Sequence, residues 1–224
     1  MKKFCSILTL VILSIAFSIA FTSCKNAVSL DLYLSEIRSA VYYGKFDNYS
    51  LSVYVEEKET PYLSDGFVGE MKKYVTVRVE DYRLALNDAT VIVIFGNTEC
   101  FGKFNYSPLD GKFITEIETN KLPIANEITI KLKSNGEEEV FTLEKLSVSG
   151  AINYQTALDK VSYYKEKEIK KMLSSKGATI ETRVRILNED KSVYYFVSVT
   201  DQKGETIAFL VDGANGEILA EKTF

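Results

Sequence analysis

The sequence predicts a mainly β protein whose carboxyl-terminal part has α+β organisation. Apolar and polar residues alternate with period two in many short segments of the first two thirds, which is typical of half-buried strands. Later, one long segment carries apolar residues at helical spacing, and more alternating segments follow. A chain of 224 residues is long enough for one or two domains. We expect a β domain at residues 30–147, an α+β domain at residues 151–224, and a hinge at Val148-Ser149-Gly150.

Residues 30–41, at the start of the β domain, fit two structures. Leucines at positions 30, 32 and 34 alternate as in a strand. One face of a helix would instead carry Leu30, Leu34, Ile37 and Val41. We favour a strand that leads into an irregular turn. Glu36 and Arg38 flank Ile37, and we expect them to form a solvated pair.

The next strands are predicted from alternation and from one apolar run. Apolar residues at positions 51, 53 and 55 alternate with polar ones, and so do the valines at positions 75, 77 and 79. Residues 91–95 are apolar throughout, which predicts a strand covered on both faces.

Four more strands complete the predicted β domain, at residues 100–106, 112–118, 127–132 and 138–143. Turn signals at Gly96-Asn97, Leu109-Asp110-Gly111 and Asn135-Gly136 separate neighbouring strands. Seven short strands at this spacing predict an immunoglobulin-like β-sandwich. The likeness is architectural, because the sequence has no tryptophan and lacks the cysteine pair of antibody domains.

The α+β domain is predicted to begin with a helix that Asn153 caps and Gly177 closes. Its apolar stripe comprises Leu158, Val161, Ile169, Met172 and Leu173. Its opposite face carries Lys160, Lys165, Lys167, Lys170 and Lys171, which we interpret as solvated surface. Three or four strands follow as an antiparallel meander, at residues 180–186, 193–199, 206–211 and 217–220, and the helix covers one face of this small sheet.

The carboxyl-terminal meander resembles the PepSY domain. The resemblance rests on the aromatic-led strand at residues 194–199 and on the closing hairpin Val211-Asp212-Gly213-Ala214-Asn215-Gly216-Glu217-Ile218. It covers roughly the last 75 residues and implies an amino-terminal helix on a short antiparallel sheet. PepSY domains occur in peptidase propeptides and membrane-associated bacterial proteins, so the resemblance implies a role in modulating a protease.

The amino terminus has a positive start at Met1-Lys2-Lys3, a largely apolar run, and Cys24 directly after two small residues. This order resembles the signal of bacterial lipoproteins, with residues 21–24 as the lipobox. The resemblance implies a signal peptide at residues 1–23, diacylglycerol on the Cys24 thiol and a tether at residues 24–29. The apolar run at residues 4–21 has eighteen residues, at the short end for a hydrocarbon core of about 30 Å, so an uncleaved transmembrane helix remains an alternative. An ordinary secretory signal is the other alternative.

Cleavage before Cys24 would remove the charges of Lys2 and Lys3 and change the formal net charge from −4 to −6. An acidic surface argues against nucleic acid and against electrostatic adhesion to anionic lipid, so the lipid on Cys24 would hold the protein at the membrane. Cys100 would then be the one unmodified cysteine, which leaves no partner for an intramolecular disulfide. We expect Cys100 to be a small buried apolar residue.

The sequence favours a non-catalytic role. It contains no histidine, which excludes Ser-His-Asp nucleophile systems and imidazole zinc sites, and no glycine-rich phosphate loop. We therefore expect no cofactor and no metal. Asp212, Asn215 and Glu217 could offer oxygen ligands to calcium, but we interpret them as turn residues. Acidic runs at residues 56–59 and 137–139 would serve a hydrolase only if two carboxylates met in a cleft.

We therefore predict a lipid-anchored protein on the extracytoplasmic face of the cell membrane that acts as a binding or regulatory module. Its partner would be an extracellular protein, and the PepSY-like part points to a protease. The alternative is a surface protein that binds a small ligand or polysaccharide, because the fourteen tyrosines offer aromatic faces for stacking.

Overall fold

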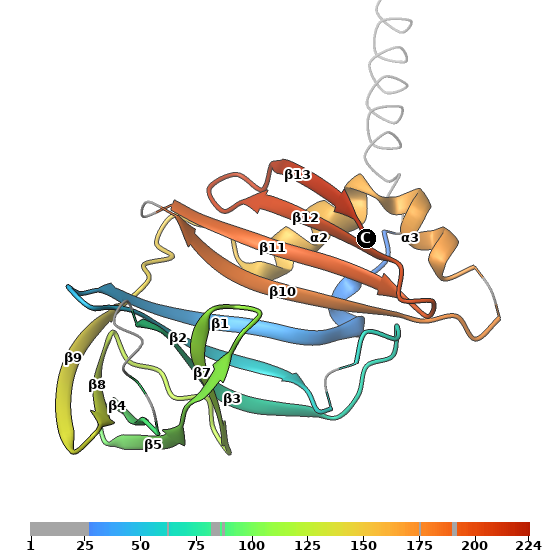
Figure 1. The fold of residues 1–224 in the computed structure, drawn as a ribbon. Coiled ribbons are helices and arrows are strands. Elements are labelled where there is room, and N and C mark those ends of the chain that lie inside the picture. Colours follow the sequence, from blue (N-terminus) through green and yellow to red (C-terminus); the bar gives the residue numbers. More distant parts are fainter. Residues whose placement is uncertain (1–26, 62, 82–85, 87, 175, 190–191) are drawn as a thin grey trace, which may run out of the picture.

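A computed structural model describes residues 27–61, 63–81, 86, 88–174, 176–189 and 192–224 (Figure 1). The described part is mainly β with two α-helices, which confirms the predicted fold class at this level. The elements of the first half are η1 (Leu30–Tyr33), β1 (Leu34–Lys45), β2 (Tyr49–Glu59), β3 (Met71–Asp81), β4 (Thr90–Phe95), β5 (Thr98–Lys103), β6 (Asn105–Ser107), β7 (Lys112–Thr119), β8 (Glu127–Ser134) and β9 (Glu137–Lys145). Those of the second half are α2 (Tyr154–Tyr164), α3 (Glu166–Met172), β10 (Ile180–Glu189), β11 (Ser192–Asp201), β12 (Thr206–Asp212) and β13 (Ile218–Thr223).

The thirteen strands of the described chain form one hydrogen-bonded sheet. Its main path runs β13-β12-β11-β10-β1-β2-β3-β7-β6, while β9, β8, β4 and β5 continue from β1 in that order. Neighbouring strands in the described residues pair antiparallel, except that β1 and β10 run parallel. The parallel pair joins the two halves of the molecule.

The first half encloses one hydrophobic core. Fully buried Val53, Val75 and Val77 project from β2 and β3 and meet Val91 and Ile130 from β4 and β8. These two layers face each other because β4, β5, β8 and β9 curve beneath β1, β2 and β3 (Figure 1). Pairing of β1 with β9 links the layers by hydrogen bonds. The immunoglobulin-like connectivity stays a prediction.

Two strand predictions in this half are wrong. Val91, Val93 and Phe95 are buried, but Ile92 and Ile94 are partly exposed, because only one face of β4 meets the core. The expected strand at residues 100–106 is two strands with different partners, since β5 pairs with β4 and β6 pairs with β7. The Asn135-Gly136 turn is confirmed, and both residues have the positive φ that a tight hairpin requires.

In the second half, helices α2 and α3 pack against β10, β11 and β12 and form a second hydrophobic core with them. Asn153 caps α2 as predicted, because its Oδ1 accepts a hydrogen bond from Thr156 N at 2.8 Å. The predicted single helix instead divides at Lys165, whose φ of −114° is not helical. The break fits the helix to the sheet, since the Tyr164 ring packs edge-on to Phe209 and Lys165 Nζ lies 2.9 Å from Glu221 of β13.

The start of the described chain belongs to the second core. The prediction for residues 30–41, a strand leading into an irregular turn, is wrong in its order, because the short 3-10 helix η1 precedes strand β1. Leu30 and Val41 are buried among Val197 and Phe209 of the second half. Ser162 Oγ of α2 donates a hydrogen bond to the Val28 carbonyl at 2.5 Å. Val28 and Leu30 therefore pack against α2 and the strands of the second half.

Candidate functional site

A cleft opens where β1 and β10 separate. Their pairing ends at Arg38 and Arg185, after which β1 pairs with β9 while β10 stays paired with β11. Because the strands run parallel, their carboxyl-terminal ends diverge on the same side of the molecule (Figure 1). The space between them measures about 540 Å³. We call it the strand cleft.

The strand cleft has aromatic and aliphatic walls. Its tyrosines come from three strands and are Tyr43, Tyr54 and Tyr194. Its aliphatic side chains are Val41, Ile186, Leu187 and Leu210. The polar lining consists of Arg38, Ser52 and Asn188. This mixture suits an organic ligand that offers an apolar or aromatic surface together with a few polar groups.

Arg38 forms the border between the strand cleft and a second hollow. Its guanidinium carbon lies 3.8 Å from the centre of the Tyr54 ring, a stacking distance for a cation on an aromatic face. Its Nε lies 3.3 Å from Glu56 Oε2. Glu36 and Arg38 were expected to be a solvated pair, and this prediction is wrong, because both are buried beside β10.

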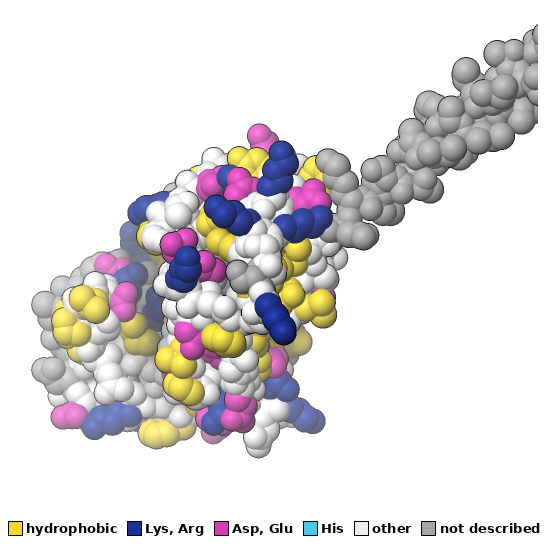
Figure 2. Space-filling view, turned by 90° about the vertical axis from the view of Figure 1, so that its right-hand side faces the viewer, with side chains coloured by type: hydrophobic (Ala, Val, Ile, Leu, Met, Phe, Trp, Pro, Cys, Tyr) yellow, Lys and Arg dark blue, Asp and Glu magenta, His cyan; other side chains and the backbone are white. Residues whose placement is uncertain are grey.

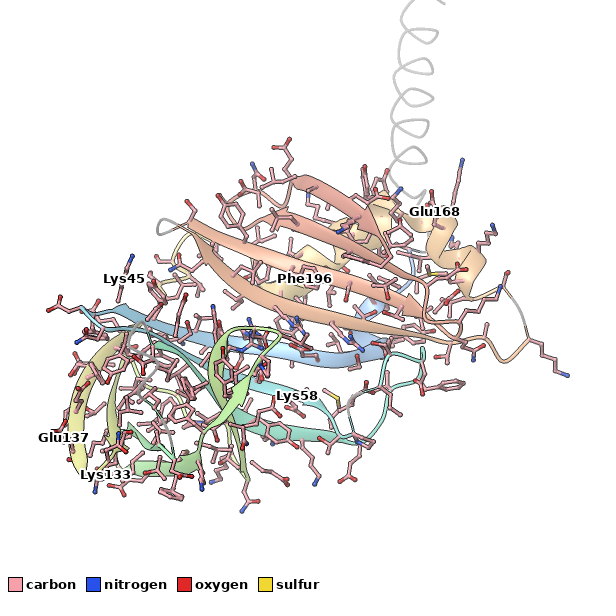
Figure 3. All side chains as sticks on the ribbon, in the orientation of Figure 1. Lys45, Lys58, Lys133, Glu137, Glu168 and Phe196 are labelled. Atoms are coloured by element: carbon pink, nitrogen blue, oxygen red, sulfur yellow. The ribbon has the colours of Figure 1, made fainter. Side chains whose placement is uncertain are left out.

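The second hollow, which we call the charged groove, measures about 280 Å³. Its cations are Arg38, Lys58, Arg78 and Arg185, and its carboxylates are Glu36, Glu56, Glu59 and Glu116. Ion pairs cross it between strands: Lys58 Nζ of β2 lies 2.5 Å from Glu116 of β7, across β3, and Arg185 Nε of β10 lies 2.5 Å from Glu36 of the adjacent β1. In Figure 3, Lys58 marks the β2 side of this face and Phe196 marks the β11 side.

Glu56 in the charged groove has three polar side chains as partners, Thr76, Lys58 and Arg38. Thr76 Oγ1 donates to Glu56 Oε1 at 2.7 Å, and Lys58 Nζ lies 3.5 Å from the same oxygen. Burial alone would raise the pKa of Glu56, but the charges of Arg38 and Lys58 and the hydrogen bonds outweigh it, so the pKa lies below its usual value. Glu56 is therefore held as an anion between two cations.

A second buried cluster joins the loop after β2 to β10. Glu59 Oε2 accepts the Gly69 N–H at 2.9 Å, while Glu59 Oε1 lies 4.0 Å from Arg183 Nη2. Arg183 Nη2 also donates to the Leu63 carbonyl at 2.8 Å and to Ser64 Oγ at 2.9 Å. One arginine of the second half thereby holds the loop of the first half.

Glu181 completes this cluster by pairing with Arg183 on the same strand. Its side chain is fully buried, and its Oε2 has no hydrogen-bond partner among the described residues. Burial, together with the nearby charges of Glu59 and Asp65, raises the pKa of Glu181 to about 7 against the lowering influence of Arg183. The carboxyl of Glu181 therefore changes its protonation state near neutral pH.

The residues singled out in the sequence do not gather at one place. Cys24, the predicted lipid attachment residue, and the predicted signal peptide lie outside the described residues. Cys100 is buried in the first core as predicted, and burial raises the pKa of its thiol. Glu137 and Glu138 are exposed on β9, and the labelled Lys133 and Glu137 lie at the far end of the first half (Figure 3).

The turn interpretation of the closing hairpin is confirmed. Asp212 Oδ1 accepts the Ala214 N–H at 2.6 Å, and Asn215 Oδ1 accepts the Glu217 N–H at 2.7 Å. Gly216 has a φ of +77°. One side-chain oxygen of Asp212 and one of Asn215 thus accept local backbone amides, as turn residues do.

The lysines of the helices are interspersed with acidic residues. Lys170 Nζ lies 2.6 Å from Glu166 one turn earlier, and Lys165 Nζ pairs with Glu221. On the face shown in Figure 2, basic and acidic side chains likewise alternate over the surface.

The meeting of Arg38 of β1 with Arg185 of β10 was not predicted from the sequence. A signal was present, because Glu36 and Arg38 alternate with Ile37 while Arg183 and Arg185 alternate with Val184. Charged residues that alternate with apolar ones can face either solvent or charged residues of a neighbouring strand. Only the tertiary pairing of the strands decides between these two environments.

Comparisons with protein-family models, with curated proteins and with solved structures gave no match to this chain. Within the described residues, none of the helices has the length and apolarity needed to cross a bilayer.

Proposed function

We propose that this protein is a lipid-anchored, non-catalytic binding protein on the extracytoplasmic face of the cell membrane, and that the strand cleft is its ligand site. The observation that carries the proposal is the lining of the cleft, three tyrosines and four aliphatic side chains around one buried arginine. Ligand sites are mostly apolar concavities with a few polar groups that fix orientation. A volume of about 540 Å³ lies in the usual range for such sites.

The state of the nearby carboxylates supports binding rather than hydrolysis. Glu56 is held by Arg38, and Glu36 is held by Arg185. Glu59 and Glu181 are both buried with Arg183 between them, away from the strand cleft. Glu36 and Glu56, each held by an arginine, are poorly suited to act as acid or base toward a ligand, and Glu181 does not line the strand cleft.

Co-purification tests the ligand site. Detergent-solubilised full chain is incubated with the small-molecule and oligosaccharide fractions of its own cell envelope, and bound molecules are identified by mass spectrometry. We expect the double variant Tyr43→Ala, Tyr194→Ala to lose molecules that the unchanged protein retains. Tyr106→Ala is the control, because Tyr106 on β6 is 49% exposed, close to the 47% of Tyr43, and lies outside the cleft. Equal retention by all three proteins would refute the cleft as the site.

Metabolic labelling with a radioactive fatty acid tests the anchor. The leader pattern that ends at Cys24 supports lipid attachment there, so we expect label on the unchanged protein and none on Cys24→Ala. Cys100→Ala keeps the label, because Cys100 is buried in the folded domain. Label that persists in Cys24→Ala, or a leader still attached to the mature chain, would contradict the proposal.

A second candidate function is protease modulation by the PepSY-like part. The succession of α2 and α3 and the antiparallel strands β10, β11, β12 and β13 supports it, because the resemblance implies a helix followed by a short meander. We expect the full chain to change the rate at which secreted proteases of the same cells digest casein. An unchanged rate at a large molar excess of the protein would argue against this candidate.

A further inference from the structure

Arg78 lies on the same sheet face as the strand cleft. It is on β3, directly opposite Ser52 of β2, and Ser52 lines the strand cleft. The Arg78 guanidinium carbon is 5.5 Å from the centre of the Tyr54 ring, and the same ring carries Arg38 at 3.8 Å. Tyr54, which lines the strand cleft, therefore contacts two of the three arginines of the charged groove, Arg38 and Arg78.

The cations of the charged groove differ in their partners. Arg38 has Glu56, Lys58 has Glu56 and Glu116, and Arg185 has Glu36. Within the described residues, no carboxylate lies within ion-pair distance of Arg78, and its buried Nε has no hydrogen-bond partner. Arg78 is thus the groove cation whose charge the described part of the protein does not balance.

The carboxylates of the groove are already engaged. Glu36 pairs with Arg185 through both oxygens, at 2.5 and 2.6 Å. Glu59 accepts the N–H groups of Leu63 and Gly69. A rearrangement that gave Arg78 one of these carboxylates would therefore break an existing contact. A carboxylate from outside the protein would complete the pairing at no such cost.

We propose that the ligand of the strand cleft carries a carboxylate, and that Arg78 holds this carboxylate while the body of the ligand rests on Tyr54. This inference rests on the proposed function and names the class of ligand. A guanidinium suits the role, because it can donate two parallel hydrogen bonds to one carboxylate. Two sources offer this chemistry, the carboxyl end of an amino acid or peptide and the carboxylate of a sugar acid.

Calorimetric titration of the detergent-solubilised full chain tests the inference. The probes are N-acetylphenylalanine, its neutral amide N-acetylphenylalaninamide, and methyl glucuronide. We expect at least one of the two acids to bind about tenfold or more tightly than the amide. Arg78→Gln should reduce that preference to about one, while Arg78→Lys retains part of it. The control Lys72→Gln removes a cation from the same strand, one that pairs with exposed Glu118, and should leave the preference unchanged.

Each outcome decides a separate point. Tighter binding of N-acetylphenylalanine assigns the carboxylate to an amino acid or peptide, and tighter binding of methyl glucuronide assigns it to a sugar acid. Equal binding of acid and amide overturns the role of Arg78 but leaves the strand cleft as a binding site. A preference that survives in Arg78→Gln, with circular dichroism like that of the unchanged protein, overturns it as well. If no probe binds at millimolar concentration, the inference fails, and the co-purification experiment still judges the cleft.

Discussion

Glu56 and Glu181 are buried carboxylates beside arginines, yet their electrostatic situations are opposite. Glu56 receives hydrogen bonds from Thr76 and Arg38 as well as the charge of Lys58, and its pKa is lowered. Glu181 has one arginine partner and one oxygen without a hydrogen-bond partner among the described residues, and its pKa is raised to about 7. Both carboxylates are desolvated, but two cations and two hydrogen bonds outweigh burial at Glu56, whereas Glu181 has one cation and the nearby anions Glu59 and Asp65.

Glu56→Gln should destabilise the protein by about 3 kcal/mol, because it leaves the buried Arg38 without its counter-charge. Chemical denaturation monitored by circular dichroism measures this. The matched control is Glu138→Gln, which removes the partner of Lys133 at the surface and should cost less than about 1 kcal/mol. A loss for Glu56→Gln no larger than that of the control would mean that the buried pair contributes no net stability.

Glu181→Gln should change how stability depends on pH. The folded-state pKa of Glu181 lies above its unfolded value, so the folded protein binds the proton more tightly than the unfolded chain does. The resulting contribution to stability is fully present below the unfolded pKa and is lost as pH rises through about 7. The stability of the unchanged protein relative to Glu181→Gln should therefore fall by about 2 kcal/mol between pH 5 and pH 8. Thermal melts of both proteins across this range measure the difference.

The exposed Glu137 supplies the control for that experiment, since Glu137→Gln should track the unchanged protein at every pH. A difference between the unchanged protein and Glu181→Gln that stays constant from pH 5 to pH 8 would show that Glu181 does not titrate in this range.

At the scale of elements, strand β1 does more than any other strand to organise the fold. It pairs with β2, β9 and β10, and its register with β2 shifts between Arg38 and Ala40. A bulge of this kind bends a strand and increases its twist. The bend lies where β1 leaves β10, so it helps to open the strand cleft.

Helix α2 depends on its amino-terminal cap. Asn153→Ala removes the acceptor for the Thr156 N–H and should cost about 1 kcal/mol of stability. For a chain of this size, the midpoint of a thermal melt should fall by about 2–4 °C. Gln155→Ala, an exposed change in the first turn, serves as the control and should leave the midpoint almost unchanged. Equal midpoints for the two variants would mean that packing alone fixes the start of the helix.

At the scale of the whole molecule, residues of the first half form part of the hydrophobic core of the second half. Leu30 and Val41 are buried with residues of α2 and β11, and β10 has β1 as its neighbour. A fragment of residues 151–224 loses these contacts. We expect it to exchange its backbone amide hydrogens far faster than the same residues do in the full chain. Equal protection in fragment and full chain would show that the second half folds by itself.

Much of this architecture could be predicted from the sequence because it follows local rules. Period-two alternation located β2, β3 and β11, and the Asn135-Gly136 pair located a hairpin. The division of the helix at Lys165 could not be predicted, because the apolar stripe continues across it and the cause is contact with β12 and β13.

For the candidate site, the sequence predicts the residue types but not how they come together. The tyrosines and the charged strand residues are visible in the sequence, but their meeting depends on the pairing of β1 with β10. Ser35 Oγ donates to the Thr182 carbonyl across 147 positions of sequence, and no local pattern encodes a contact of that kind. The burial of Glu36 and Arg38 has the same origin, since alternation with Ile37 looks the same for a solvated strand.

The parallel pairing of β1 with β10 also determines when folding can be completed. A chain that is synthesised or passed through a membrane as an unfolded thread presents β1 long before β10 arrives, and contacts so distant in sequence form slowly. Until then the edge of β1 is open and Leu30 lacks its burial partners. Chains that end before residue 180 lack β10, so we expect them to be degraded more readily than full-length copies.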